Sequence, residues 1–204
     1  MGNHFHDYAT TLAGAIAATE ASDLHHKPLS VDQAVVAAHR MIRAIAGTPN
    51  KLMFIGNGGS AGIAGHMAID FTKNGGVRSV TFNDASSLTC LGNDLGYDQV
   101  FSKQVEMQGL AGDILIAISS SGESKNILNA VTAARKMKAH VISLSGFKAG
   151  NSLRQMGDLN LYTPSAVYGF VETAHQALLH VILDTGMGWT VADRTVCRGH
   201  RGTV

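Results

Sequence analysis

The sequence predicts an α/β fold in which helices cover both faces of a parallel sheet. Three observations lead to this prediction. Short apolar runs alternate with longer stretches of helical spacing, Gly- and Ser-rich loops directly follow two of these runs, and 45% of the 204 residues are hydrophobic. Alternating strands and helices build parallel sheets that are covered on both sides, and a chain of this length can bury the core of one domain.

The first segments of the chain have a helical pattern. Ala, Leu, Ile and Met recur at helical spacing over residues 8–21 and again over residues 31–46. Pro28 and Ser30 mark the break between these segments. We therefore expect two helices ahead of the first strand.

A strand–loop–helix pattern begins at residue 51. Residues 51–55 form a short run that is apolar after Lys51, residues 56–59 are rich in Gly, and residues 61–73 have helical spacing. The same order returns with the apolar run 113–118, a Ser/Gly loop and a helical stretch over 125–138. Each unit predicts a strand whose carboxyl end leads through a short loop into a helix.

Further segments complete the predicted domain. Strands are expected over 77–81, 140–144 and 158–162, and a long helix over 168–183. Ligands of such sheets bind at the carboxyl ends of the strands, where the loops emerge. We divide the chain into an N-terminal helix and linker (1–30), an α/β domain (31–185) and a C-terminal tail (186–204).

Composition excludes several functional classes. The net charge is +1, from 16 basic and 15 acidic residues that are mixed along the chain, so we expect no nucleic-acid partner and no attraction to anionic membranes. Cys90 and Cys197 lie far apart and form no CxxC pair, which is typical of a reducing compartment. We find no signal peptide and no apolar run of roughly 18 residues, and we expect a cytoplasmic protein.

Two loops have the composition of a phosphate site. They are Gly56-Asn57-Gly58-Gly59-Ser60 and Ser119-Ser120-Ser121-Gly122-Glu123-Ser124. Small residues let backbone N–H groups approach an anion at the positive N-terminus of the following helix, and hydroxyls add donors. A purely structural interpretation is that Ser124 caps its helix and Gly122 turns the chain. Neither loop has the GxGxxG pattern of dinucleotide sites or the P-loop pattern.

These loops carry a resemblance to a known family. The GNGGS loop, the Ser-Ser-Ser-Gly-x-Ser loop, Leu91-Gly92-Asn93-Asp94 and Gly112-Asp113 resemble the SIS (sugar isomerase) fold and, within it, the phosphoheptose isomerases. The resemblance covers about residues 5–185. It implies a three-layer αβα SIS fold with two leading N-terminal helices, and assembly as a homotetramer.

Within the resembled fold, a polar cluster on two helices distinguishes the isomerases from regulatory SIS proteins. His66 and Asp70 are spaced i, i+4 and share a helix face, whereas Glu172 and His180 lie on the late helix. The resembled enzymes have His, Glu, Gln and His at these four positions, and these hold zinc in the members that bind it. The resemblance thus implies a zinc site of His66, Asp70, Glu172 and His180, and zinc accepts both ligand types. The chain departs from the family at Asp70, at Glu172 and at Gly169, where the enzymes usually have Asp.

The resemblance also implies a reaction. It is the isomerisation of sedoheptulose 7-phosphate, a ketose, to D-glycero-D-manno-heptose 7-phosphate, an aldose, which makes the protein an intramolecular oxidoreductase. His180 is expected to be the acid, and the base is either Asp70 or Glu172. The expected substrate-binding residues are Asn57, Gly58, Gly59, Ser60, Asp94, Ser119, Ser120, Ser121 and Ser124.

Two alternatives stay open at this point. One is a non-catalytic SIS module that senses a phosphosugar or binds a protein such as a replication initiator; the cluster of His66, Asp70, Glu172 and His180 argues against it. The other is an isomerase of a different phosphosugar, from surface-polysaccharide or secondary-metabolite synthesis. The two carboxylates in the cluster keep this second alternative in competition, because they alter the charge of the site.

Overall fold

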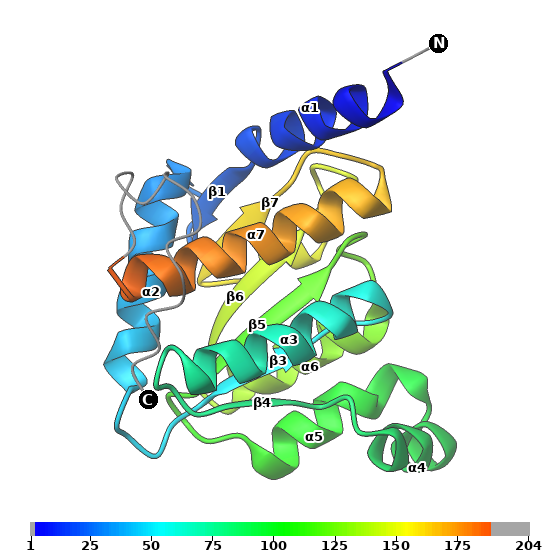
Figure 1. Ribbon diagram of the computed structural model, residues 1–204. Helices are drawn as coiled ribbons and strands as arrows, with labels where there is room; N and C mark the ends of the chain where they lie inside the picture. Colours follow the sequence, from blue (N-terminus) through cyan, green and yellow to red (C-terminus); the bar gives the residue numbers. More distant parts are fainter. Residues whose placement is uncertain (1–2, 189–204) are drawn as a thin grey trace.

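A computed structural model describes residues 3–188 of the chain, and a seven-stranded sheet runs through its centre (Figure 1). The strand order is β2-β1-β7-β6-β5-β3-β4. From β4 to β7 all neighbours are parallel, whereas β1 pairs antiparallel with both β2 and β7. The strands are β1 (Glu20–Asp23), β2 (Pro28–Leu29), β3 (Leu52–Ile55), β4 (Ser79–Thr81), β5 (Ile114–Ser119), β6 (His140–Ser145) and β7 (Leu159–Tyr162).

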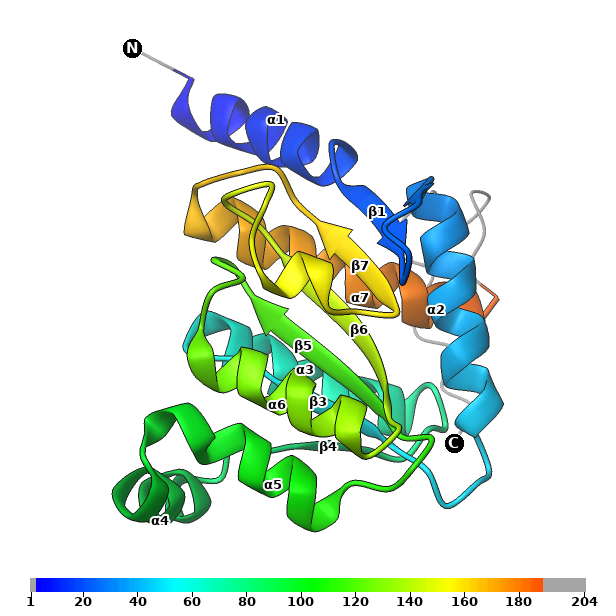
Figure 2. The same ribbon diagram turned by 180° about the vertical axis from the view of Figure 1, so that it is seen from behind.

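Helices cover both faces of the sheet, which confirms the predicted three-layer αβα architecture. Figure 1 is viewed from the face that carries α2, α3 and α7, and Figure 2 from the face that carries α5 and α6. The helix α1 lies along α7, and α4 lies beside α5. The helices are α1 (His4–Ala17), α2 (Val31–Ile45), α3 (Gly59–Lys73), α4 (Ala85–Leu95), α5 (Val100–Gln108), α6 (Lys125–Lys136) and α7 (Tyr168–Gly186).

Each face of the sheet has its own hydrophobic core. Side chains alternate along β3, so that Leu52 and Phe54 pack with α2, α3 and α7, whereas Met53 and Ile55 pack with α5 and α6. All four side chains are fully buried. Burial on both faces explains why the central strands are continuous apolar runs rather than alternating ones.

The N-terminal region contains a feature that the sequence did not predict. Both expected leading helices are present, but α1 ends at Ala17, and the β1–β2 hairpin lies between the two helices. Part of the predicted linker therefore belongs to the sheet: Ala21 pairs with Leu161, and Ser22 pairs with Asn160. Such a short strand next to the edge of the sheet is stabilised by its pairing partners, so its own sequence gives little signal.

The chain reverses its direction of winding between β3 and β5. From β3 it passes through α3 to β4 at one edge, and from β5 it passes through α6 to β6 on the other side. At such a switch point two adjacent loops diverge and leave a crevice at the carboxyl ends of the strands. The two loops predicted to bind phosphate are those that follow β3 and β5.

Two further predictions concern membrane-spanning segments and the C-terminal tail. No helix within residues 3–188 is long and apolar enough to cross a membrane. Most of the predicted tail, including Cys197, lies outside the described residues.

Candidate active site

Tight backbone packing shapes the loop after β3. A Cβ at Gly56 would lie 2.5 Å from the backbone carbonyl of Ser60, so only glycine fits there. Gly58 has a φ of 55° and is the N-cap of α3, a conformation that glycine adopts without strain. The loop folds back on itself and buries the Ser60 side chain at the start of α3.

Amide hydrogen bonds join this loop to the helix that follows β5. The side chains of Asn57 and Asn126 bond to each other twice, at 2.9 Å in both directions. The hydroxyl of Tyr97 also donates to Oδ1 of Asn57, at 3.1 Å. Asn126 is buried at the first turn of α6, so this pair fixes the two loops relative to each other.

The loop after β5 presents hydroxyls that the protein itself uses incompletely. Ser119 Oγ accepts from the N–H of Gly122, at 3.1 Å, whereas the buried Ser120 Oγ has no hydrogen-bond partner among residues 3–188. Ser124 is the N-cap residue of α6, but its side chain makes no capping bond. The structure therefore contradicts the interpretation that Ser124 only caps its helix. Gly122 does turn the chain, with a φ of 67°.

The two loops enclose a hollow of about 120 Å³ at the carboxyl end of the sheet. A buried hydroxyl without a protein partner beside such a hollow is typically satisfied by water or a ligand, and the N-terminus of α6 favours an anion. Ile118 and Tyr168 were not predicted to line it. The hollow is lined by Asn57, Ser60, Ile118, Ser119, Ser120, Ser121, Ser124, Tyr168 and Glu172.

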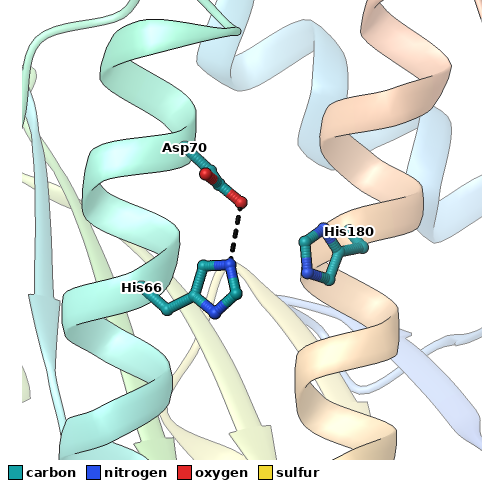
Figure 3. Close-up of side chains that lie close together, drawn as sticks. All are labelled: His66, Asp70 and His180. Atoms are coloured by element: carbon teal, nitrogen blue, oxygen red, sulfur yellow. Dashed lines mark ion pairs between the residues drawn. The ribbon is translucent and has the colours of Figure 1, made fainter. Parts of the chain in front are cut away.

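Three of the four predicted metal ligands lie together on facing surfaces of α3 and α7. Figure 3 shows His66 and Asp70 on α3 pointing toward His180 on α7. Nε2 of His66 lies 3.1 Å from Oδ2 of Asp70, and the two imidazole rings are edge to face, with centroids 5.4 Å apart. One ligand atom from each residue lies within 4.8 Å of the other two. This donor set and spacing fit a transition-metal ion such as zinc.

Glu172 lies apart from this cluster. It is about 12 Å before His180 along the helix axis, since eight residues separate them. Its carboxylate lies against Gly59, where a Cβ would overlap both carboxylate oxygens. Glu172 lines the serine hollow and also a groove of about 550 Å³ between α3 and α7 that reaches His180. The carboxylate thus stands between the hollow and the His/Asp cluster.

Gln176 is a polar contact that sequence reasoning missed. Its Nε2 lies 3.0 Å from Nδ1 of His66, and it lines the groove between α3 and α7. The signal that could have found it is helical spacing. Gln176 is four residues from both Glu172 and His180, so it falls on the helix face between them.

His175 is a buried residue of the core rather than part of the cluster. Its Nε2–H donates to the backbone carbonyl of Ser145 at the end of β6, at 3.0 Å, and its Nδ1 is buried without a partner. Burial lowers the pKa of His175 to about 4, against a smaller opposite effect of the bond to Ser145. The ring is therefore uncharged under ordinary conditions.

Neither Asp94 nor Gly169, both named in the sequence analysis, lines the hollow. Asp94 is exposed near the end of α4, where it contacts Asn93 and Cys90, and its predicted role in substrate binding stays a prediction. Gly169 faces α1, since a Cβ there would lie 2.9 Å from the hydroxyl of Tyr8. Tyr8 in turn packs on Phe170, with ring centroids 4.8 Å apart.

Comparisons with known proteins agree on one family. The sequence matches SIS domain families over residues 29–146 and 107–187. It is 36% identical to a phosphoheptose isomerase of Neisseria gonorrhoeae over 187 residues, which are 86% of this chain and 94% of the relative. It is 41% identical to one of Campylobacter concisus over 140 residues, 65% and 72% of the two chains. The solved structure of a phosphoheptose isomerase from Francisella tularensis aligns with a TM-score of 0.77 at 26% identity, covering 92% of this chain and 96% of the other.

Proposed function

This chain belongs to the SIS domain family and, within it, to the phosphoheptose isomerases, and we propose that it interconverts sedoheptulose 7-phosphate and D-glycero-D-manno-heptose 7-phosphate. One observation carries the proposal. Glu172 lines the serine hollow, and a groove that it shares with His180 runs along α7 toward the His/Asp cluster. A sugar held in the hollow by its terminal phosphate would extend along this groove, with its reacting carbons at the cluster.

The phosphate is proposed to bind in the hollow through the serine hydroxyls and the N-terminus of α6. Ser120 supplies a hydroxyl donor that is bonded to no other group in the described part of the chain. The backbone N–H groups of Gly58 and Gly59 and the side chains of Asn57 and Ser60 complete the site. Binding energy from the unreactive phosphate end would hold C1 and C2 against the acid and the base.

The reaction itself moves protons without net oxidation. A base removes a proton from C1 of the ketose while His180 donates one to the carbonyl oxygen on C2, which gives an enediol. The base then returns the proton to C2, and His180 takes up the hydroxyl proton of O1 as the C1 carbonyl forms, so both groups regain their starting protonation. The base is Asp70 or Glu172: Asp70 lies beside His180 in the cluster, whereas Glu172 lines both the groove and the hollow.

We propose that zinc is held by His66, Asp70 and His180. The resemblance adds Glu172 as a fourth ligand, and in this role its carboxylate would have to leave Gly59. When bound, the ion would supply positive charge that stabilises developing negative charge on the sugar oxygens. Asp70 is shorter than the Glu that the resembled enzymes carry, which favours a ligand role for Asp70 and proton transfer by Glu172.

Assembly as a cytoplasmic homotetramer is also a proposal. In support of assembly, α1 has no buried residue within one chain, and its Phe5 is 85% exposed. An apolar helix face of this kind is typically covered by another subunit. Sedimentation velocity of the purified protein would give the oligomeric state directly.

The function is tested by NMR of the purified protein with sedoheptulose 7-phosphate, with and without zinc. We expect new aldose signals, and a protein that binds the sugar without converting it would favour the non-catalytic SIS module. Conversion of another phosphosugar alone would favour the second alternative.

The two candidate bases are distinguished by Glu172→Gln and Asp70→Asn, assayed side by side. If Glu172 carries the proton, Glu172→Gln abolishes turnover and leaves phosphate binding intact. An active Glu172→Gln protein together with an inactive Asp70→Asn protein would instead assign the base to Asp70.

A further inference from the structure

Gln176 is the polar side chain of α7 that bonds to His66 from across the groove. The His66 ring is bonded at both of its nitrogens: Nδ1 faces Nε2 of Gln176 at 3.0 Å, and Nε2 faces Oδ2 of Asp70 at 3.1 Å. The His66 side chain is 50% exposed, so packing alone leaves its ring free to rotate. These two hydrogen bonds therefore define its orientation.

This orientation decides which nitrogen faces the cluster. With Nδ1 bonded to Gln176, Nε2 points to Asp70 on the side of His180 (Figure 3). A ring turned by half a revolution about its bond to Cβ would lose both bonds. Partners that bond to the non-ligating nitrogen of a histidine commonly fix its tautomer and its direction in this way.

A carboxamide can hold the ring in both of the states that a metal centre requires. Without an ion, Nε2 of His66 carries the hydrogen and donates to Asp70, and Nδ1 accepts from the amide group of Gln176. When the Nε2 lone pair binds an ion, the hydrogen is on Nδ1. Gln176 then accepts it with Oε1 after a half turn of its amide, because an amide offers both a donor and an acceptor.

We propose that Gln176 is the positioning residue of this centre and holds His66 in the orientation that binds the ion. The expected effect on metal binding rests on the proposed metal site, whereas the orientation of the His66 ring is a property of the metal-free protein. The ring orientation and the zinc affinity can therefore be measured separately.

The variants are Gln176→Met, which keeps the length of the side chain without its amide, and Gln176→Glu, which keeps an acceptor. Thr173→Val is the matched control. Thr173 lies in the same groove one turn earlier, but its hydroxyl bonds only to the carbonyl of Gly169 in its own helix, at 2.7 Å. Thermal melting of each variant establishes that the fold is kept.

The first measurement is NMR of the His66 ring in metal-free protein, where nuclear Overhauser contacts between the ring protons and α7 report the orientation of the ring. The parent and Thr173→Val should show one orientation. Gln176→Met keeps the bond to Asp70 but loses the partner of Nδ1, so its ring should show contacts that are averaged over more than one orientation. A single, parent-like ring orientation in Gln176→Met would overturn the proposal.

The second measurement is the zinc dissociation constant, obtained by competition with a chelating dye. Gln176→Met should bind zinc about 10- to 100-fold more weakly, the usual effect of removing such a partner. Gln176→Glu should stay close to the parent, because it still accepts the hydrogen on Nδ1. Equal losses in Gln176→Met and Gln176→Glu, or no loss in either, would overturn the proposal. A parent that binds no zinc would refute the metal site of the proposed function, and the NMR measurement would still decide the role of Gln176.

Discussion

Gly59 offers a way to move the Glu172 carboxylate without touching Glu172 itself. A Cβ at Gly59 would lie 2.6 Å from Oε1 of Glu172 and overlap Oε2 as well, where about 3.5 Å is the ordinary contact distance. In Gly59→Ala the carboxylate must therefore withdraw by roughly 1 Å. Because it is the end of a flexible side chain, this movement costs little stability.

The expected effects on stability and on activity have opposite signs. Alanine in place of glycine in a helix gains up to about 1 kcal/mol of unfolding free energy, so Gly59→Ala should melt at the same temperature as the parent or higher. A misplacement of about 1 Å in a reacting group costs on the order of a hundredfold in rate. We therefore expect a stable protein with strongly reduced turnover.

Gly62→Ala is the control for this experiment. Gly62 lies in the same helix and lines the same groove, but a Cβ there meets nothing within 4 Å. It should gain the same helical stability and keep the parent rate. Isomerase assays and thermal melts of Gly59→Ala and Gly62→Ala measure the changes in turnover and in stability. Parent-like turnover in Gly59→Ala would refute the reasoning, because the position of the Glu172 carboxylate would then not matter.

Three further predictions concern buried polar groups. Asp113→Asn removes the partner of the buried Lys51, whose Nζ lies 2.7 Å from Oδ2, and should lower the unfolding free energy by about 3–5 kcal/mol in urea titrations; a loss below about 1 kcal/mol would contradict this. The folded-state pKa of His175, about 4, lies below its usual 6.5, so stability is fully present above pH 6.5 and should fall by about 3 kcal/mol as pH drops to 4. His175→Gln should flatten this slope in urea titrations at a series of pH values, and equal slopes would argue against it. Ser120→Ala should leave stability unchanged but weaken phosphosugar binding about tenfold by calorimetry, and unchanged affinity would exclude Ser120 from the phosphate site.

The central part of the fold could be predicted because its signals are local. The apolar runs of β3 and β5 are buried on both faces, and each is followed at once by Gly or Ser, so strand, loop and helix can be recognised in order. The β1–β2 hairpin had no such signal, because the sequence Glu-Ala-Ser-Asp forms a strand through its pairing with β2 and β7. The sequence also did not indicate α4, which within residues 3–188 buries no residue and packs on the core only through the half-buried Leu88 and Leu91.

The site could be predicted in part for a related reason. The i, i+4 spacing of His66 and Asp70 follows from helix geometry alone, whereas the meeting of α3 with α7 depends on the packing of the whole sheet. Which polar residue of α7 meets His66 is decided by that packing. The sequence therefore indicated His180 and Glu172 through resemblance, but it did not indicate Gln176.

The lining of the serine hollow has a consequence for substrate capture. Among the described residues, those that line it include neither Lys nor Arg, and the only charged one is Glu172. A dianionic sugar phosphate would then meet no cationic side chain in the hollow itself, and the short-range part of its binding should depend little on ionic strength. Selection of the ligand would instead depend on the geometry of uncharged donors, so common inorganic anions at cellular concentrations should compete through shape rather than through charge.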